Sequence, residues 1–150
     1  MQINLVNEGG QAIGHKEKSA LLPGDIYHSV FIFLVTPLKE VVVSRMSEGR
    51  LSATAVGLNT PGETPEQTAL RALSVISPQE VPALHHLGDQ FYTATNGRKT
   101  YISVFYGTTH ATDIQQTHVA MTAAEIDATL DSCTPALQFA WKSYRHLLPV

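Results

Sequence analysis

The sequence lacks the features of a disulfide-stapled, membrane-spanning or nucleic-acid-binding protein. Its single cysteine, Cys133, excludes a disulfide framework within the chain and a cysteine-built zinc site. The longest apolar run, residues 30–35, is far shorter than the ~20 residues that a membrane helix needs. The formal net charge is −3, so no basic surface for nucleic acid or a membrane is indicated. We therefore expect neither partner.

The amino terminus has no basic segment followed by an apolar run, so we expect no secretory signal and a cytoplasmic protein. The 150 residues fit one domain, residues 1–150. A domain of this size can bury roughly 70% of its unfolded surface. Hydrophobic residues make up 43% of the chain and charged residues 15%, which is enough apolar material for a core without crosslinks.

Turn residues divide much of the chain into short predicted strands. The run at residues 26–36 is nearly continuously apolar, which indicates a strand buried on both faces. Turns at residues 7–10 and 96–98 predict two hairpins. The residues at 47–50 are expected to form a loop. Strands are expected at residues 3–6, 11–15, 26–36, 41–43, 91–95, 99–106 and 116–121.

Capping patterns predict helices in the middle and at the end of the chain. A threonine cap, a proline at the first helical position and a glutamine three residues after the cap predict a helix from Thr64 to the residue before Ser77. A second capping pattern begins at Thr122. A last helix is expected to run from Thr134 to about Leu148. Strands first and helices later predict an α/β (α+β) domain with helices packed on a mixed sheet.

The segment at residues 57–76 resembles the Nudix box, written G-x5-E-x7-R-E-U-x-E-E-x-G-U, where U is a bulky aliphatic residue. Gly57, Glu63 and Arg71 fall at the required spacings, and Leu73 fills the first U position. The resemblance implies a Nudix-type α/β/α sandwich with a mixed β-sheet. Because Nudix folds commonly form dimers, it also implies a homodimer as a candidate assembly.

The same segment departs from the family pattern at its acidic residues. The three glutamates of the helix fall on Ala72, Val75 and Ile76. In the family these carboxylates bind Mg²⁺ or Mn²⁺ on a diphosphate, and hard cations need oxygen ligands. The three positions share one helical face. We therefore expect no metal at this face and no cofactor.

Two carboxylates remain beside the loop. Glu63 holds a position that often assists at the metal in the family, or it contacts Arg71 or loop amides. Glu66 is expected to stabilise the helix N-terminus through the macrodipole. Glu63 and Glu66 are the only candidates that we retain for catalysis, and neither is assigned a catalytic role. The expected ligand-binding residues are Arg45, Arg50, Glu63 and Arg71.

Histidine and cysteine add no clear site. The seven histidines show no H-x3-H or H-E-x2-H spacing, and His85 and His86 should point to opposite faces of a strand. Cys133 lies at a helix start, which suggests a slightly acidified thiol, but a small buried residue is the favoured interpretation.

Three functions stay open on the sequence alone. The favoured one is a non-catalytic or sensory binder of a nucleotide or phosphorylated metabolite. For this function we expect a ligand-binding groove with an apolar wall, formed by Val75 and Ile76, and a basic rim. The rim residues are expected to be Arg45, Arg50, Arg71 and Arg98. The alternatives are a hydrolase of nucleoside diphosphate-linked compounds with a non-standard Mg²⁺ or Mn²⁺ site, and a structural or protein-interaction domain.

Overall fold

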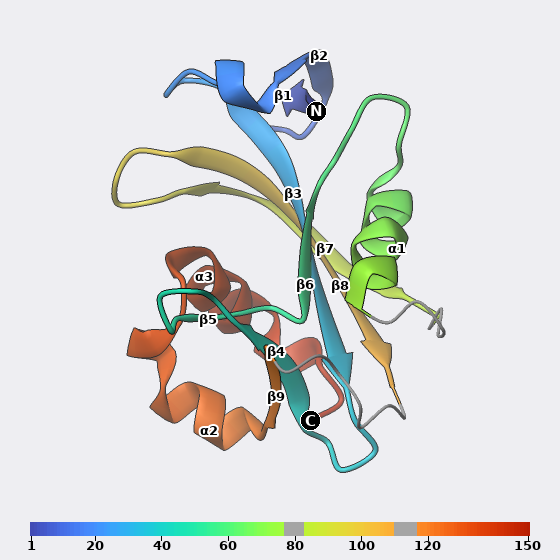
Figure 1. Ribbon diagram of the computed structural model, residues 1–150, viewed down its shortest axis with the longest axis vertical. Helices are drawn as coiled ribbons and strands as arrows, with labels where there is room; N and C mark the ends of the chain where they lie inside the picture. Colours follow the sequence, from blue (N-terminus) through green and yellow to red (C-terminus); the bar gives the residue numbers. More distant parts are fainter. Residues whose placement is uncertain (77–82, 110–116) are drawn as a thin grey trace.

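The computed structural model describes residues 1–76, 83–109 and 117–150, and its strands form one curled mixed sheet (Figure 1). The described strands are β1 (Gln2–Val6), β2 (Ala12–Glu17), β3 (Ile26–Val35), β4 (Val41–Arg45), β5 (Leu51–Ser52), β6 (Ala55–Leu58), β7 (His85–Thr93), β8 (Lys99–Thr108) and β9 (His118–Met121). The described α-helices are α1 (Pro65–Ile76), α2 (Ala123–Ala128) and α3 (Pro135–Tyr144), and the 3-10 turns are η1 (Lys18–Ala20), η2 (Leu130–Ser132) and η3 (Arg145–Leu147). Within these ranges, each helix falls short of the length and apolarity needed to cross a membrane.

Strand β3 is the centre of the sheet. It pairs in parallel with β8 along its whole length. On its other edge it pairs antiparallel with β1, then β6, then β4. Its last eight residues are all buried, as suits a run of valine, isoleucine and phenylalanine with neighbours on both edges. The prediction of a buried strand at residues 26–36 is confirmed, except that the strand ends at Val35 and its first two residues are only half-buried.

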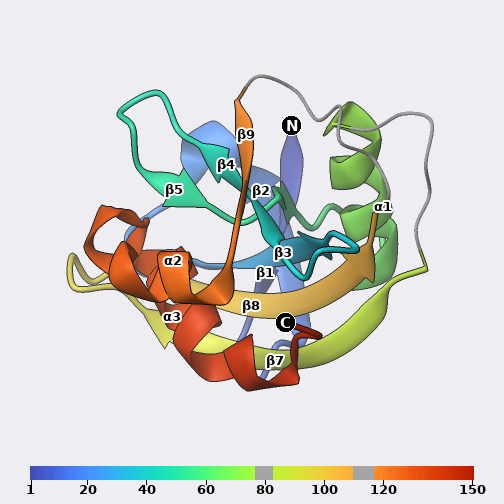
Figure 2. The same cartoon turned by 90° about the horizontal axis from the view of Figure 1, so that it is seen from below.

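Successive side chains of β3 enter two separate cores, because neighbouring residues of a strand point to opposite faces. Phe33 packs in the core that holds Trp141 of α3, and their rings meet edge-on with centroids 6.1 Å apart. Ile32 packs in the core that holds Leu73 of α1. Figure 2 shows α1 well separated from α2 and α3. Helices therefore cover both faces of the mixed sheet, as expected.

Threonine caps begin α1, α2 and α3, as predicted. Thr64 Oγ1 accepts a hydrogen bond from the Gln67 N–H at 3.2 Å, and the Gln67 side chain accepts one from the Thr64 N–H at 2.9 Å. Thr122 and Glu125 form the same reciprocal pair. Thr134 accepts from the third residue of α3. These bonds satisfy N–H groups that the first helical turn leaves without a partner.

Several boundaries differ from the prediction. Strands β5 and β6 were not expected, because they are too short to show a period in the sequence. β7 begins at His85 rather than at residue 91, since pairing with β8 continues through its polar residues. The α-helical part of the last helix ends at Tyr144, and η3 continues it as a tighter turn. α1 ends at Ile76, as predicted, whereas residue 116, where a strand was expected to start, lies outside the described residues.

Candidate ligand-binding groove

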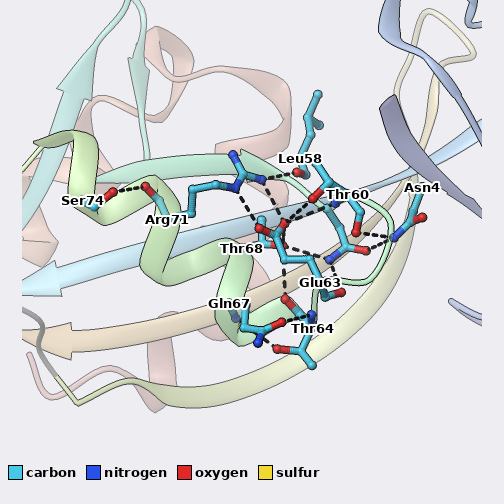
Figure 3. A network of polar contacts seen from close by, with 10 residues as sticks. Asn4, Leu58, Thr60, Glu63, Thr64, Gln67, Thr68, Arg71 and Ser74 are labelled. Atoms are coloured by element: carbon cyan, nitrogen blue, oxygen red, sulfur yellow. Dashed lines mark hydrogen bonds and ion pairs between the residues drawn. The ribbon is translucent and has the colours of Figure 1, made fainter. Parts of the chain in front are cut away.

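The loop between β6 and α1 is organised around the carboxylate of Glu63 (Figure 3). The Arg71 guanidinium donates to both carboxylate oxygens, from Nε at 2.8 Å and from one Nη at 3.0 Å. The Thr68 hydroxyl donates at 2.6 Å, and Thr60 donates through its hydroxyl and its backbone N–H at 3.0 and 3.3 Å. The expected contacts of Glu63 with Arg71 and with a loop amide are therefore both present.

A buried asparagine connects this loop to the rest of the fold. The Asn59 side chain donates to the Glu63 carbonyl and to the Thr68 hydroxyl, each at 2.9 Å. The Asn4 side chain of β1 donates to the Asn59 side-chain oxygen at 2.6 Å and to the Thr60 carbonyl at 2.9 Å. Figure 3 shows the contacts of Asn4 with the loop. Sequence reasoning missed Asn59 and Thr68, because a buried polar residue is recognised only from its partners.

The ion pair holds both side chains in their charged forms. The Arg71 hydrogen bonds lower the pKa of Glu63 to about 2, against the opposing effect of burial and with further help from Thr68 and Thr60. The same pairing raises the pKa of Arg71. The two charges compensate each other, and the same Arg71 Nη2 that donates to Glu63 also donates to the Leu58 carbonyl at 2.8 Å. Arg71 thus connects α1 to the loop.

Replacing Glu63 with glutamine should lower the free energy of unfolding at pH 7 by about 1 to 2 kcal/mol, a value reduced because Arg71 is 42% exposed. The pKa of Glu63 is depressed in the folded state. Its stabilisation is therefore fully present above the ordinary carboxylate pKa of 4.5 and is lost as the pH falls towards about 2. Urea unfolding of both proteins at pH 7 and pH 3 measures this, and the difference between them should shrink at the lower pH.

Glu66→Gln is the matched control for this measurement. Glu66 is an exposed carboxylate in the first turn of the same helix, so its loss should cost less than about 1 kcal/mol. A Glu63→Gln penalty that stays equal at pH 7 and pH 3 would show that the lost hydrogen bonds matter, and the charge does not.

A groove of about 720 Å³ lies beside this loop, within the range of small-molecule sites. Ala72, Val75 and Ile76 of α1 line one side of it. Tyr27, from β3, lies in its lining as well. The expected apolar wall at Val75 and Ile76 is therefore present. The lining also includes Val56 and Leu58 of β6, Lys18 of η1, and Arg98 of the turn between β7 and β8.

Every formally charged residue described in the lining of this groove is basic. These residues are Lys18, Arg71 and Arg98. Arg45 and Arg50, which were expected on the rim, do not line the groove. Ser44 of β4 does line it, and Arg45 follows Ser44 directly, so the alternation of a strand turns Arg45 away. Arg50 is exposed in the turn before β5.

The donor set beside α1 does not fit a hard divalent cation. The wall residues Ala72, Val75 and Ile76 have no side-chain oxygen, and hard cations require oxygen ligands. The oxygens of Glu63 already accept five hydrogen bonds, and Glu66 does not line the groove. Across the described ranges, no group of three or more histidine, cysteine, aspartate or glutamate residues is placed to hold a metal ion.

Structural contacts account for three of the described histidines and for Cys133. His85 stacks on Tyr106, and His86 pairs with Asp89 at 2.8 Å. His118 contacts the Thr54 carbonyl at 2.9 Å. Cys133 is fully buried, and burial raises the pKa of its thiol. The suggestion of an acidified thiol is therefore wrong, and the interpretation as a small buried residue is confirmed.

Solved structures share this architecture, although no protein-family model and no curated protein matches the chain. The crystal structure of DR0079 from Deinococcus radiodurans matches with a TM-score of 0.78 and 18% identity, over 95% of this chain and 98% of that one. A NUDIX hydrolase from Nitrosomonas europaea matches with a TM-score of 0.63 and 17% identity, over 82% and 90%. The NUDIX domain of NrtR from Shewanella oneidensis, in complex with ADP-ribose, matches with a TM-score of 0.59 and 16% identity, over 89% and 94%. This chain therefore has the mixed-sheet α+β Nudix fold.

Proposed function

We propose that this chain, acting as one cytoplasmic domain, binds a nucleotide or another phosphorylated metabolite in the groove without metal-dependent hydrolysis. The observation that carries the proposal is the pairing of a basic lining with an α1 wall that has no oxygen ligand. Basic side chains attract phosphate directly. The ADP-ribose complex of the NrtR domain supports it, because a domain of similar fold binds a phosphorylated ligand.

The test is thermal unfolding with ADP-ribose, ADP, AMP and sugar phosphates, in EDTA and again with Mg²⁺. A ligand present at about 100 times its dissociation constant adds about 2.7 kcal/mol of stability. For a domain of this size, that corresponds to a rise in Tm of roughly 5 to 10 °C. We expect the same rise in EDTA and in Mg²⁺, with the ligand recovered intact by chromatography.

Two other results of this experiment would each support one of the alternative functions. Mg²⁺-dependent release of phosphate or a nucleoside monophosphate supports a hydrolase with a non-standard metal site. No shift with any compound supports the structural or protein-interaction role.

Carboxylates restored to the α1 wall should not create a hydrolase. In a Val75→Glu, Ile76→Glu double variant, new carboxylates would stand beside the groove without an assembled set of further ligands. We expect no Mg²⁺-dependent turnover and weaker binding of anionic ligands than in the wild type. A Val75→Gln, Ile76→Gln variant is the control of matched size, and it should retain more binding because it adds no negative charge. Brisk turnover by the double glutamate variant would contradict the proposal.

A further inference from the structure

The basic charge of the groove is concentrated away from α1. Arg71, beside α1, is compensated by its ion pair with Glu63. Lys18 and Arg98 also line the groove, and within the described residues neither forms an ion pair with a carboxylate. In Figure 1 the turn between β7 and β8, which carries Arg98, lies on the opposite side of β6 from α1. The turn that carries Arg98 therefore lies across β6 from the α1 wall.

An aromatic ring helps to place the Arg98 guanidinium. Its central carbon lies over the Tyr27 ring, 5.5 Å from the ring centroid, within the range of a cation–π contact. A smaller cavity of about 350 Å³ shares Leu21, Tyr27 and Arg98 with the groove, so the concave surface continues past this point. Asp25 lines that cavity, but it is paired with Lys16 at 2.8 Å. The carboxylate therefore does not cancel the charge of Arg98.

The α1 side of the groove offers apolar surface. Val75 is 73% exposed and Val56 of β6 is 43% exposed, and both line the groove together with Ala72 and Ile76. Aliphatic side chains cannot bind phosphate, but they gain free energy when a ligand covers them. A phosphate placed at this wall would lie against alkyl groups, whereas a hydrocarbon chain placed there would be favoured.

We propose that the ligand is an amphiphilic organic phosphate whose phosphate binds Lys18 and Arg98 beside Tyr27 and whose aliphatic chain lies along the α1 wall. The inference rests on the proposed function and specifies the ligand class and its orientation. A guanidinium and an ammonium together supply donors and positive charge to a phosphate. The two side chains thereby provide the cationic partner that a phosphate needs in a binding site.

Calorimetric titration with butyl, hexyl and octyl phosphate in EDTA tests both halves of the proposal. The affinity should rise with chain length, by up to about fourfold per methylene if each group is fully buried. Octyl phosphate should bind more tightly than inorganic phosphate, AMP or octanoate. The difference in affinity between octyl phosphate and inorganic phosphate measures the contribution of the alkyl chain. The difference between octyl phosphate and octanoate measures the contribution of the phosphate group.

Variants separate the two ends of the groove. Arg98→Gln and Lys18→Gln should each lower the affinity for every alkyl phosphate by a similar factor. The dependence of affinity on chain length should stay unchanged. Val75→Ser with Ile76→Ser should flatten the dependence on chain length and preserve phosphate binding. Lys142→Gln is the matched control for a lost positive charge, because Lys142 is exposed on α3 and does not line the groove. It should bind like the wild type.

Distinct outcomes overturn the inference and the proposed function. AMP or ADP-ribose binding more tightly than octyl phosphate in EDTA would overturn the ligand class and leave the proposed function standing. Loss of binding in Arg71→Gln with no effect of Arg98→Gln or Lys18→Gln would overturn the orientation. An affinity independent of chain length, or no binding of any alkyl phosphate, would overturn the ligand class. Hydrolysis of the ligands with Mg²⁺ would instead overturn the proposed function.

Discussion

Trp141→Ala should lower the free energy of unfolding by about 3 to 5 kcal/mol, as large aromatic deletions in well-packed cores do. Trp141 is 1% exposed and packs edge-on against Phe33 of the central strand. Its indole N–H donates to an Asp127 carboxylate oxygen at 2.7 Å, which ties α3 to α2. The substitution removes both the packing against Phe33 and the hydrogen bond to Asp127. Urea unfolding at pH 7, followed by circular dichroism, measures the loss.

Trp141→Phe separates the two contributions. Phenylalanine keeps much of the apolar contact with Phe33 but cannot donate to Asp127, so it should cost less than the alanine variant, about 1 to 3 kcal/mol. If the two variants were equally destabilised, the hydrogen bond to Asp127 would dominate and the account of the core would fail.

Gly57→Val should cost about 1 to 3 kcal/mol and should also weaken ligand binding in the groove. A Cβ atom at Gly57 would lie 3.0 Å from Thr68 Cγ2 and 3.2 Å from Ala72 Cβ. β6 therefore packs so closely on α1 that any side chain at this position pushes the helix away. Because α1 forms one wall of the groove, its displacement should change stability and the affinity for alkyl phosphates together, measured by urea unfolding and calorimetry.

Gly14→Val is the matched control for this effect. A Cβ atom at Gly14, in β2, would have no atom within 4 Å, and valine is well suited to strands. The control should therefore change stability by no more than about 0.5 kcal/mol. Equal penalties at the two glycines would mean that backbone entropy, and not the contact with α1, explains the result.

Local chemistry explains which elements could be predicted from the sequence. The Thr64 cap and the turn at residues 96–98 depend on residues a few positions apart, so their pattern is visible in the chain itself. The contact of Glu63 with Arg71 was one of the two roles considered for Glu63, because both residues fall within the segment that resembles the Nudix box. These features position α1 and its loop.

Features that depend on distant segments could not be predicted. Asn59 and Lys18 have no local pattern that marks them, since their roles arise when β1, η1 and the loop before α1 come together. Arg45 was placed on the rim because arginine is a suitable phosphate ligand, but a one-residue alternation along β4 decides which side chain faces the groove. Strand register of this kind is set by tertiary pairing and not by composition.

The parallel pairing of β3 with β8 has a consequence for synthesis of the chain. Each β3 residue is partnered by one that follows much later, from Ile26 with Lys99 to Val35 with Thr108. A nascent chain on the ribosome therefore presents this ten-residue, largely apolar strand long before β8 is translated. Such long-range closure slows folding, and an unpaired apolar edge invites self-association. Fragments truncated before residue 108 should accordingly accumulate as aggregates in cells and depend on chaperones that shield exposed strands.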